Sequence, residues 1–371
     1  MSDHHFADSL TPQQDRAAGA VMGSIIGDAL GVGPHWYYDL DELHAAYPTP
    51  ICGYVPVHPG RYHDGVELGD VSQTGQFQQL LLESLVAKGT YQEEDYLRRL
   101  EPLLDTLDGE PESGRFTEQP IRDIWYALKV EGKHWHDDDF ASLADTSEAA
   151  QRAVLIGARY HGDLMQAGLH CAACARLTHR DPAIVTASTA FGIVIGALVA
   201  GMPLDGNLGQ TMRQMILRGE LPFTHAVLAE EQHLGLTPPR PSRELPFPDV
   251  LLGMGWWIQA AQSPHIQVQP PEAIAQVYGM ACSLSMLMPA AFFLAAHTPD
   301  SFEKPILTAI NSGGNNMARA AMTGALCGAH LGLSAIPKRL ITGLKDHQRW
   351  VNDAIQLAKD ADLGHCNAEP A

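Results

Sequence analysis

The chain has 371 residues, of which 45% are hydrophobic and 18% are charged, and its formal net charge is −19. This composition is typical of a globular protein with enough apolar mass for a deep core. A surface that is so acidic repels nucleic acid and anionic membranes. We therefore expect neither as a partner, and we expect a small-molecule ligand in a local pocket.

The N-terminal segment MSDHHFADSL is polar and lacks the apolar stretch of a signal peptide. Residues 183–202 come closest to the length of a membrane-spanning helix, but their Thr, Ser and Gly content favours a buried helix. Cys171 and Cys174 form one CxxC without the second pair that a zinc site normally needs, so we expect buried free thiols. We expect a cytoplasmic protein.

Helical periodicity is clear from Pro12 to Leu30 and recurs along the chain. Gly19, Gly23 and Gly27 repeat every fourth residue. Because a glycine costs about 1 kcal/mol in a helix interior, we expect another backbone to pack closely against this face. No strand-like alternation and no βαβ pattern occurs. Further helices are predicted at about 74–88, 93–107, 118–130, 147–160, 182–201, 206–218, 271–296, 301–311, 315–331 and 337–359.

Two irregular stretches, 44–70 and 219–250, are rich in proline or glycine and are expected to be ordered surface loops. The second is alternatively a linker between domains. The helical pattern predicts an all-α orthogonal bundle. We expect a single domain over residues 1–371, with flexible ends at about 1–10 and 361–371.

The first candidate motif is a glycine-rich turn at the end of a helix, over residues 27–39. His35 titrates near neutral pH and is a candidate acid or base, with Asp28 or Asp39 as the group that orients its ring. The aromatic residues that follow it can stack on a planar ligand; they are Trp36, Tyr37 and Tyr38. The alternative is an aromatic plug over a helix C-terminus.

Two further turns are rich in uncharged polar residues. Residues 69–76 open a helix, where free N–H groups suit an anion or a ribose hydroxyl, although simple capping by Ser72 or Thr74 explains them equally well. Residues 311–318 join two apolar helices, as a ligand-binding turn or as a plain connection. The candidate ligand-binding residues in these turns are Ser72, Gln73, Thr74, Gln76, Asn311, Gly313, Gly314, Asn315 and Asn316.

Two other segments carry weaker indications. Residues 145–152 begin a helix, and capping by Thr146 or Ser147 is favoured over a role in a pocket. Residues 177–182 join two helices and hold His179, a modest pocket candidate.

Taken together and in order, these segments resemble the ADP-ribosylglycohydrolase family over about residues 17–345. The GD-A-L-G turn of the family is matched at 27–31, and its LTH-x-DP joint at 177–182. Its late Asn-x-Gly-Gly turn and small-residue helix are matched at 311–328, and its Ala-Ile-Pro-x-x-Leu helix start at 335–340. The resemblance implies an all-α bundle of the ADP-ribosylglycohydrolase type.

The resemblance also implies two Mg²⁺ ions, which the family usually binds through Thr-Asp-Asp-Thr and Asp-x-Asp-Thr segments. These fall here on residues 72–75 and 315–318, where no carboxylate remains. Because Mg²⁺ prefers carboxylate oxygen, we expect no metal at these positions and no other cofactor. The glutamate that often follows the GD-A-L-G turn is His35 here. Lens J-type crystallins show a similar loss, and the chain resembles that branch.

These observations lead to one hypothesis with one alternative. The hypothesis is a hydrolase of a glycosidic or C–N bond that acts on a ribosyl, nucleoside-like or similar small ligand without the dinuclear Mg²⁺ centre. His35 is its acid or base, and the candidate partners are Asp28, Asp39, Asp70 and Glu148. The alternative is a non-catalytic crystallin-like or ligand-binding protein. The substrate and the oligomeric state stay open.

Overall fold

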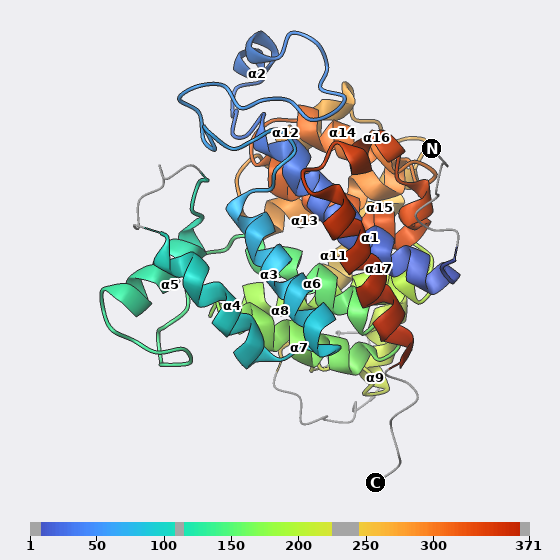
Figure 1. Ribbon diagram of the computed structural model, residues 1–371. Helices are drawn as coiled ribbons and strands as arrows, with labels where there is room; N and C mark the ends of the chain where they lie inside the picture. Colours follow the sequence, from blue (N-terminus) through green and yellow to red (C-terminus); the bar gives the residue numbers. More distant parts are fainter. Residues whose placement is uncertain (1–8, 108–114, 225–244, 364–371) are drawn as a thin grey trace.

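The computed structural model describes residues 9–107, 115–224 and 245–363, which form helices joined by turns and loops (Figure 1). Within these ranges, β-type pairing is confined to isolated bridges, so the predicted all-α fold is confirmed. The segments expected to be flexible ends lie largely outside the described residues. The longer helices are α1 (Pro12–Val32), α3 (Gln73–Lys88), α4 (Glu93–Asp105), α5 (Gln119–Lys129), α6 (Glu148–Arg159), α7 (Leu164–Arg176), α8 (Pro182–Val199), α9 (Leu208–Leu217), α11 (Val250–Gln262), α13 (Leu284–His297), α14 (Glu303–Asn311), α15 (Asn316–Leu331) and α17 (His347–Leu363); the short ones are α2 (Leu40–Ala46), η1 (Pro271–Ala273), α12 (Ile274–Tyr278), η2 (Leu333–Ala335) and α16 (Lys338–Thr342).

Helix α1 is the axis of the fold. Thr11 caps its start in a capping box with Gln14, and every residue from Ala17 to Val32 is buried. Its main partner is α15, and Figure 1 shows the two helices side by side. The glycines of the two helices face each other: a Cβ added to Gly23 would lie 2.0 Å from the Gly324 carbonyl oxygen. The predicted close approach of a second backbone is therefore confirmed.

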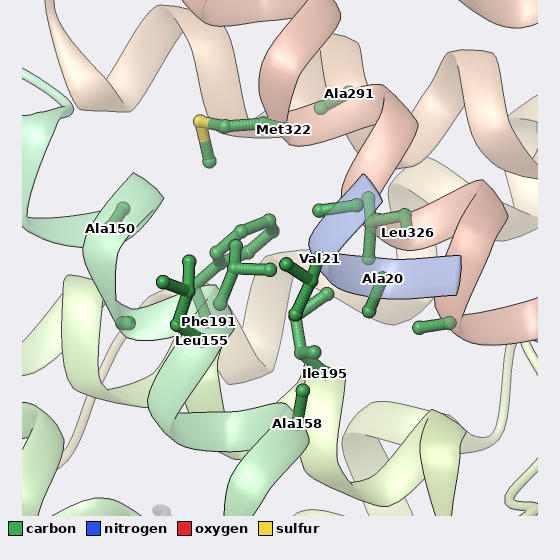
Figure 2. Packing of buried hydrophobic residues seen from close by; sticks show 14 of the residues in the cluster. Ala20, Val21, Ala150, Leu155, Ala158, Phe191, Ile195, Ala291, Met322 and Leu326 are labelled. Carbon is green, nitrogen blue, oxygen red and sulfur yellow. The ribbon is translucent and has the colours of Figure 1, made fainter. Parts of the chain in front are cut away.

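The apolar core surrounds this helix pair. Figure 2 shows small and branched side chains of α1, α6, α8 and α15 meeting in one cluster. Helix α8 is long and apolar enough to cross a membrane by length and composition, and 78% of that stretch is buried inside the protein. The labelled members of the cluster are Ala20, Val21, Ala150, Leu155, Ala158, Phe191, Ile195, Ala291, Met322 and Leu326.

Several predicted element bounds are wrong. The helix expected over 271–296 is divided into η1, α12 and α13, and it breaks at Gly279, which has a φ of 119°. The helix expected over 337–359 is divided into α16 and α17, with Asp346 in the left-handed region between them. Helices α2, α7 and α11 were not among the predicted ranges. The irregular stretch 219–250 lies mostly outside the described residues.

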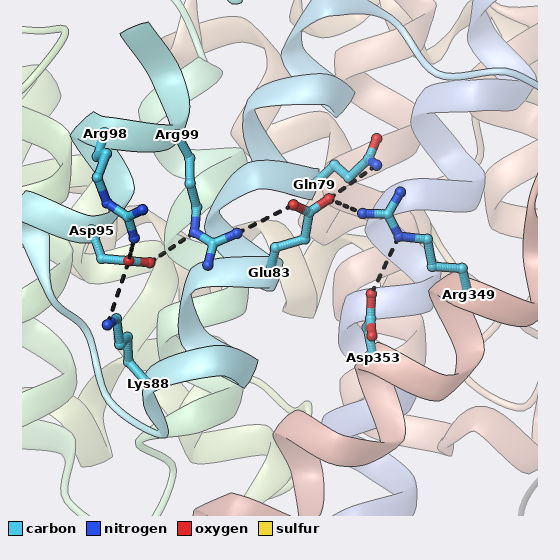
Figure 3. A network of polar contacts seen from close by, with 8 residues as sticks. All are labelled: Gln79, Glu83, Lys88, Asp95, Arg98, Arg99, Arg349 and Asp353. Atoms are coloured by element: carbon cyan, nitrogen blue, oxygen red, sulfur yellow. Dashed lines mark hydrogen bonds and ion pairs between the residues drawn. The ribbon is translucent and has the colours of Figure 1, made fainter. Parts of the chain in front are cut away.

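A network of charged side chains ties α3 to its neighbours (Figure 3). Glu83 of α3 pairs with Arg99 of α4 at 3.5 Å and with Arg349 of α17, and it accepts a hydrogen bond from Gln79 at 3.1 Å. Arg99 also pairs with the buried Asp95 at 2.7 Å. Exposed ion pairs contribute only about 0.2–1 kcal/mol each, so the network fixes the direction of α3 more than it stabilises the fold.

Gly23→Ala tests the close packing of α1 on α15. Helix propensity alone would raise the free energy of unfolding by about 1 kcal/mol, whereas the clash with Gly324 should lower it by about 1–3 kcal/mol. We expect a net loss in denaturant titration. Gly53→Ala is the matched control, because the nearest atom to its added Cβ lies 3.7 Å away. A Gly23→Ala protein as stable as the wild type would contradict the packing described above.

Candidate active site

Three segments that are distant in sequence meet at the ends of α1, α3 and α15. Asp28 accepts two hydrogen bonds from Ser72, one from the backbone N–H at 2.8 Å and one from the hydroxyl at 2.6 Å. His35 contacts Asn316 at 3.3 Å, and the Gly314 N–H donates to the Tyr37 carbonyl at 2.6 Å. The structure thus brings residues 27–39, 70–76 and 311–317 together.

Two more segments extend this region. The Gln73 amide donates to the Thr117 hydroxyl at 3.1 Å, which places the start of α5 beside the start of α3. Residues 280–283 run from the asparagine turn to the start of α6, because Met280 accepts from the Asn315 N–H at 2.8 Å and Ser283 forms a bridge with Thr146. The starts of α3, α5, α6 and α15 therefore surround one region.

Glu148, at the first position of α6, is a buried and ionised carboxylate. Burial acts to raise its pKa, but His179 at 3.4 Å and the Thr146 hydroxyl, which donates to it, hold the pKa below its usual value. The His179 ring is fixed on its other side by the Thr178 hydroxyl at 2.8 Å. Glu148 therefore carries a negative charge at neutral pH.

Glu118, which precedes α5, is a second buried carboxyl, and its pKa is shifted in the opposite direction. It is 4% exposed, and its side chain makes no capping hydrogen bond to α5. Burial raises its pKa well above the usual value, and the negative charges of Glu148 and Asp28 act in the same direction, against the opposing charge of Arg122. Glu118 therefore keeps its proton to a higher pH than an ordinary glutamate does.

Asp28 is the third buried carboxyl of the region. Burial raises its pKa to about 6, although the hydrogen bonds from Ser72 and the charge of Arg115 act to lower it. Asp28 is ionised at neutral pH and joins α1 to the cap of α3.

The comparisons with known proteins agree with this architecture. The sequence model of the ADP-ribosylglycohydrolase family matches residues 9–368. The chain belongs to the ADP-ribosylglycohydrolase family. An uncharacterized protein of Archaeoglobus fulgidus is 25% identical over 336 residues, which cover 90% of this chain and 93% of the relative.

A solved structure described as an ADP-ribosylglycohydrolase-related protein complex is similar to the chain in fold. Its TM-score is 0.60 and its sequence identity 18%, and the match covers 95% of this chain and all of that one.

His35, the predicted acid or base, lies in surroundings that differ from those expected. Its ring is fully buried, with the Trp36 ring centroid at 4.9 Å and the His63 ring centroid at 5.0 Å. Burial lowers its pKa to about 4. The predicted orientation of this ring by Asp28 or Asp39 is wrong, because its Nδ1 faces Asn316 instead.

The other predicted acids have structural partners. Asp39 is exposed and caps α2 by accepting from the Asp41 N–H at 2.8 Å. Asp70 pairs with Arg115 at 2.8 Å and with Lys345 at 3.0 Å. Partial burial acts to raise the pKa of Asp70, but the hydrogen bond from Lys345 and the charge of Arg115 bring it below the usual value. These contacts do not bring Asp39 or Asp70 next to Glu118 and Glu148.

The uncharged residues of the turns at 72–75 and 314–318 act as caps or turns. The Ser72 hydroxyl accepts from the Gly75 N–H at 3.1 Å and starts α3, and Asn315 accepts from the Ala318 N–H at 3.1 Å and starts α15. Gly314 has a φ of 59°, and a Cβ there would lie 2.3 Å from the Met280 carbonyl oxygen. Capping by Ser72, which the sequence left open, is therefore present, and Asn315 caps its helix as well.

The remaining predicted ligand-binding residues differ in what they offer. Asn311 is engaged with the Ile51 backbone at 2.9 Å through both its oxygen and its nitrogen. Thr74 is buried and Gln76 half-buried in the first turn of α3. Gly313, like Gly314, has a positive φ, of 67°.

The aromatic residues that follow His35 divide into two groups. Tyr37 is buried beneath Arg61, whose guanidinium lies 3.9 Å from the ring centroid, so Tyr37 offers no free face to a ligand. Trp36, Tyr62 and Phe116 form an edge-on cluster with centroids 5.1–5.2 Å apart. Tyr38 and Tyr62 lie at the open side of this cluster, where their exposed fractions are 53% and 45%, so both rings are accessible to a ligand.

Glu118 is the residue that the sequence analysis missed. It precedes a Gln-Pro helix start, and an acid at that place is typical of ordinary helix N-termini. No spacing to another motif marks it, because its neighbour Glu148 is supplied by a different helix. Glu148 itself was predicted, although as a partner for His35.

The burial of His35 predicts a pH dependence of stability. The unfolded chain binds a proton on this ring below pH 6.5 and the folded protein does not until about pH 4, so stability falls as the pH falls through this window. The variant His35→Gln keeps a hydrogen-bond donor for Asn316 but has no ring that can be protonated. Its free energy of unfolding should therefore fall less on acidification than that of the wild type, by up to about 1.4 kcal/mol per pH unit. Urea titrations at pH 7 and pH 5 measure it.

The exposed His44→Gln is the control for this experiment. Asp28 contributes in the opposite direction, because its raised pKa favours folding as the pH falls below about 6, but it does so equally in both proteins. An unchanged pH slope in His35→Gln would show that His35 does not titrate as a buried ring.

Proposed function

We propose that this member of the ADP-ribosylglycohydrolase family is a hydrolase that cleaves the glycosidic C–N bond of a ribosyl ligand without a dinuclear Mg²⁺ centre. The observation that carries the proposal is the pair of Glu118 and Glu148, two buried carboxyls whose surroundings shift their pKa values in opposite directions. Such a pair supplies an acid and a base at the same pH, as glycoside hydrolysis requires.

Each carboxyl has one task in this reaction. Glu118 gives its proton to the departing nitrogen as the bond from that nitrogen to the sugar breaks. Glu148 stabilises the positive charge that develops on the sugar and takes a proton from the attacking water, whose oxygen forms the new bond to the anomeric carbon. His179 and Thr146 keep Glu148 ionised, so His35 is not needed as acid or base and serves to position the adjoining turn.

The residues at the family's metal positions do not fit two Mg²⁺ ions. The Ser72 hydroxyl donates to Asp28 and accepts from an amide, and the Asn315 oxygen is used as a helix cap. Met317, at the second Asp position, is buried and offers a soft sulfur. Mg²⁺ prefers hard, charged oxygen. No group of three or more acidic, His or Cys side chains among the described residues is arranged to hold a metal ion.

Calorimetric titration tests the proposed loss of the metal centre. Without a carboxylate at residues 72–75 or 315–318, we expect no Mg²⁺ binding tighter than about millimolar. A double variant Gln73→Asp with Asn315→Asp, which restores one carboxylate in each motif, is the comparison and should bind Mg²⁺ more tightly than the wild type. Micromolar binding by the wild type would defeat this part of the proposal.

Turnover tests the carboxyl pair. In a screen of nucleoside and ADP-ribosyl substrates, Glu118→Gln and Glu148→Gln should each lower kcat by about 10²–10⁴-fold, since each removes one proton-transfer group. The exposed Glu42→Gln is the matched control. Full activity in either site variant would reject its assigned role.

A non-catalytic, crystallin-like or ligand-binding role is the second candidate. The capping roles of Ser72 and Asn315 favour it, because they stabilise the scaffold and leave those side chains no part in chemistry. Absence of turnover by the wild type on the whole screen would support this candidate. In both cases the proposed partner is a small molecule, in keeping with the acidic surface.

A further inference from the structure

We infer that this site takes an unphosphorylated nucleoside or a close relative, and that Glu148 and Asp28 select against phosphorylated ligands. The inference rests on the proposed function in placing the ligand beside Glu118 and Glu148. It goes further by assigning the ligand's class and the groups that determine specificity.

The first argument is charge. Asp28, Glu118 and Glu148 are 0%, 4% and 3% exposed, respectively, so little water screens them. A phosphate brought close to ionised carboxylates in such surroundings is repelled far more strongly than in water. The net charge of −19 adds to this repulsion at longer range.

The arginines next to the carboxyls are already engaged. Arg115 pairs with Asp70 at 2.8 Å and donates to the Val71 carbonyl at 2.8 Å. Arg122 donates to Gln119 at 2.8 Å. Each guanidinium therefore already uses part of its hydrogen-bonding capacity within the protein.

The second argument is hydrogen bonding. The Gln73 carbonyl oxygen is buried and has no partner, while the amide nitrogen of the same side chain is held by Thr117. This oxygen and the ionised carboxylates are acceptors, which match the hydroxyl and N–H donors of a nucleoside. A phosphate at neutral pH offers mainly acceptors, so it cannot satisfy them.

The third argument is the aromatic cluster. Tyr38 is half exposed, and its pKa is raised by burial and by the neighbouring Cys282 and Glu118, which places the phenol beside the carboxyl region. Together with Trp36 and Tyr62, it gives a planar base a surface to stack on, while the sugar reaches the carboxyls. A base at this position is also within the region where Glu118 would protonate it.

Binding of uncleavable ligands tests the inference separately from turnover. The probes are the C-nucleosides formycin A and pseudouridine, their 5′-monophosphates, and ADP-ribose, each titrated calorimetrically into the full chain. At least one C-nucleoside should bind at least about tenfold more tightly than its own monophosphate and than ADP-ribose, because only the phosphorylated ligands meet the charge repulsion.

Glu148→Gln sharpens the test. Removing this charge should reduce the difference in affinity between a nucleoside and its monophosphate. If Glu148 had a purely structural role, the substitution would weaken the binding of both ligands alike. Glu42→Gln should leave the gap unchanged. The inference is overturned if a monophosphate or ADP-ribose binds the wild type as tightly as the nucleosides, or if no probe binds. Glu118-dependent hydrolysis of an ADP-ribosyl substrate would then leave the proposed function intact and reject only this inference.

Discussion

The backbone contact between α1 and α15 is the constraint on which the rest of the structure depends. Two helices approach this closely only where side chains are absent, and Gly19, Gly23, Gly324 and Gly328 supply that absence. The contact fixes the end of α1, which carries Asp28, relative to the start of α15, which carries Asn315. Helices α3, α6 and α17 pack around this pair, so the starts of several helices converge on one region.

The candidate site is built from helix starts that uncharged residues hold in place. Ser72 and Asn315 cap the helices that they begin. Burial raises the pKa of Glu118, whereas His179 and Thr146 overcome the effect of burial and hold the pKa of Glu148 below its usual value. The buried carboxyls of the region thus come from α1, from α6 and from the residue before α5.

The parts of the structure that depend on local sequence were the parts that could be predicted. The glycine repeat of α1 and the buried character of α8 follow from spacing and residue type, and Ser72 was one of the two caps that the sequence offered for α3. The break at Gly279 was missed because the apolar pattern continues across it. The orientation of His35 depends on Asn316, and the proposed role of Glu118 depends on Glu148. Both partners lie far away in the sequence, so a local pattern cannot predict these contacts.

The burial of α1 from Ala17 to Val32 has a consequence for how the chain reaches this structure. During synthesis α1 emerges first, but α15 and α17, which cover it, emerge last. Its apolar residues therefore lack their main native partner until α15 has been made. Contacts of such long sequence separation slow folding and prolong the exposure of apolar surface. The helix that organises the finished protein therefore exposes apolar surface while the helices between α1 and α15 are being synthesised.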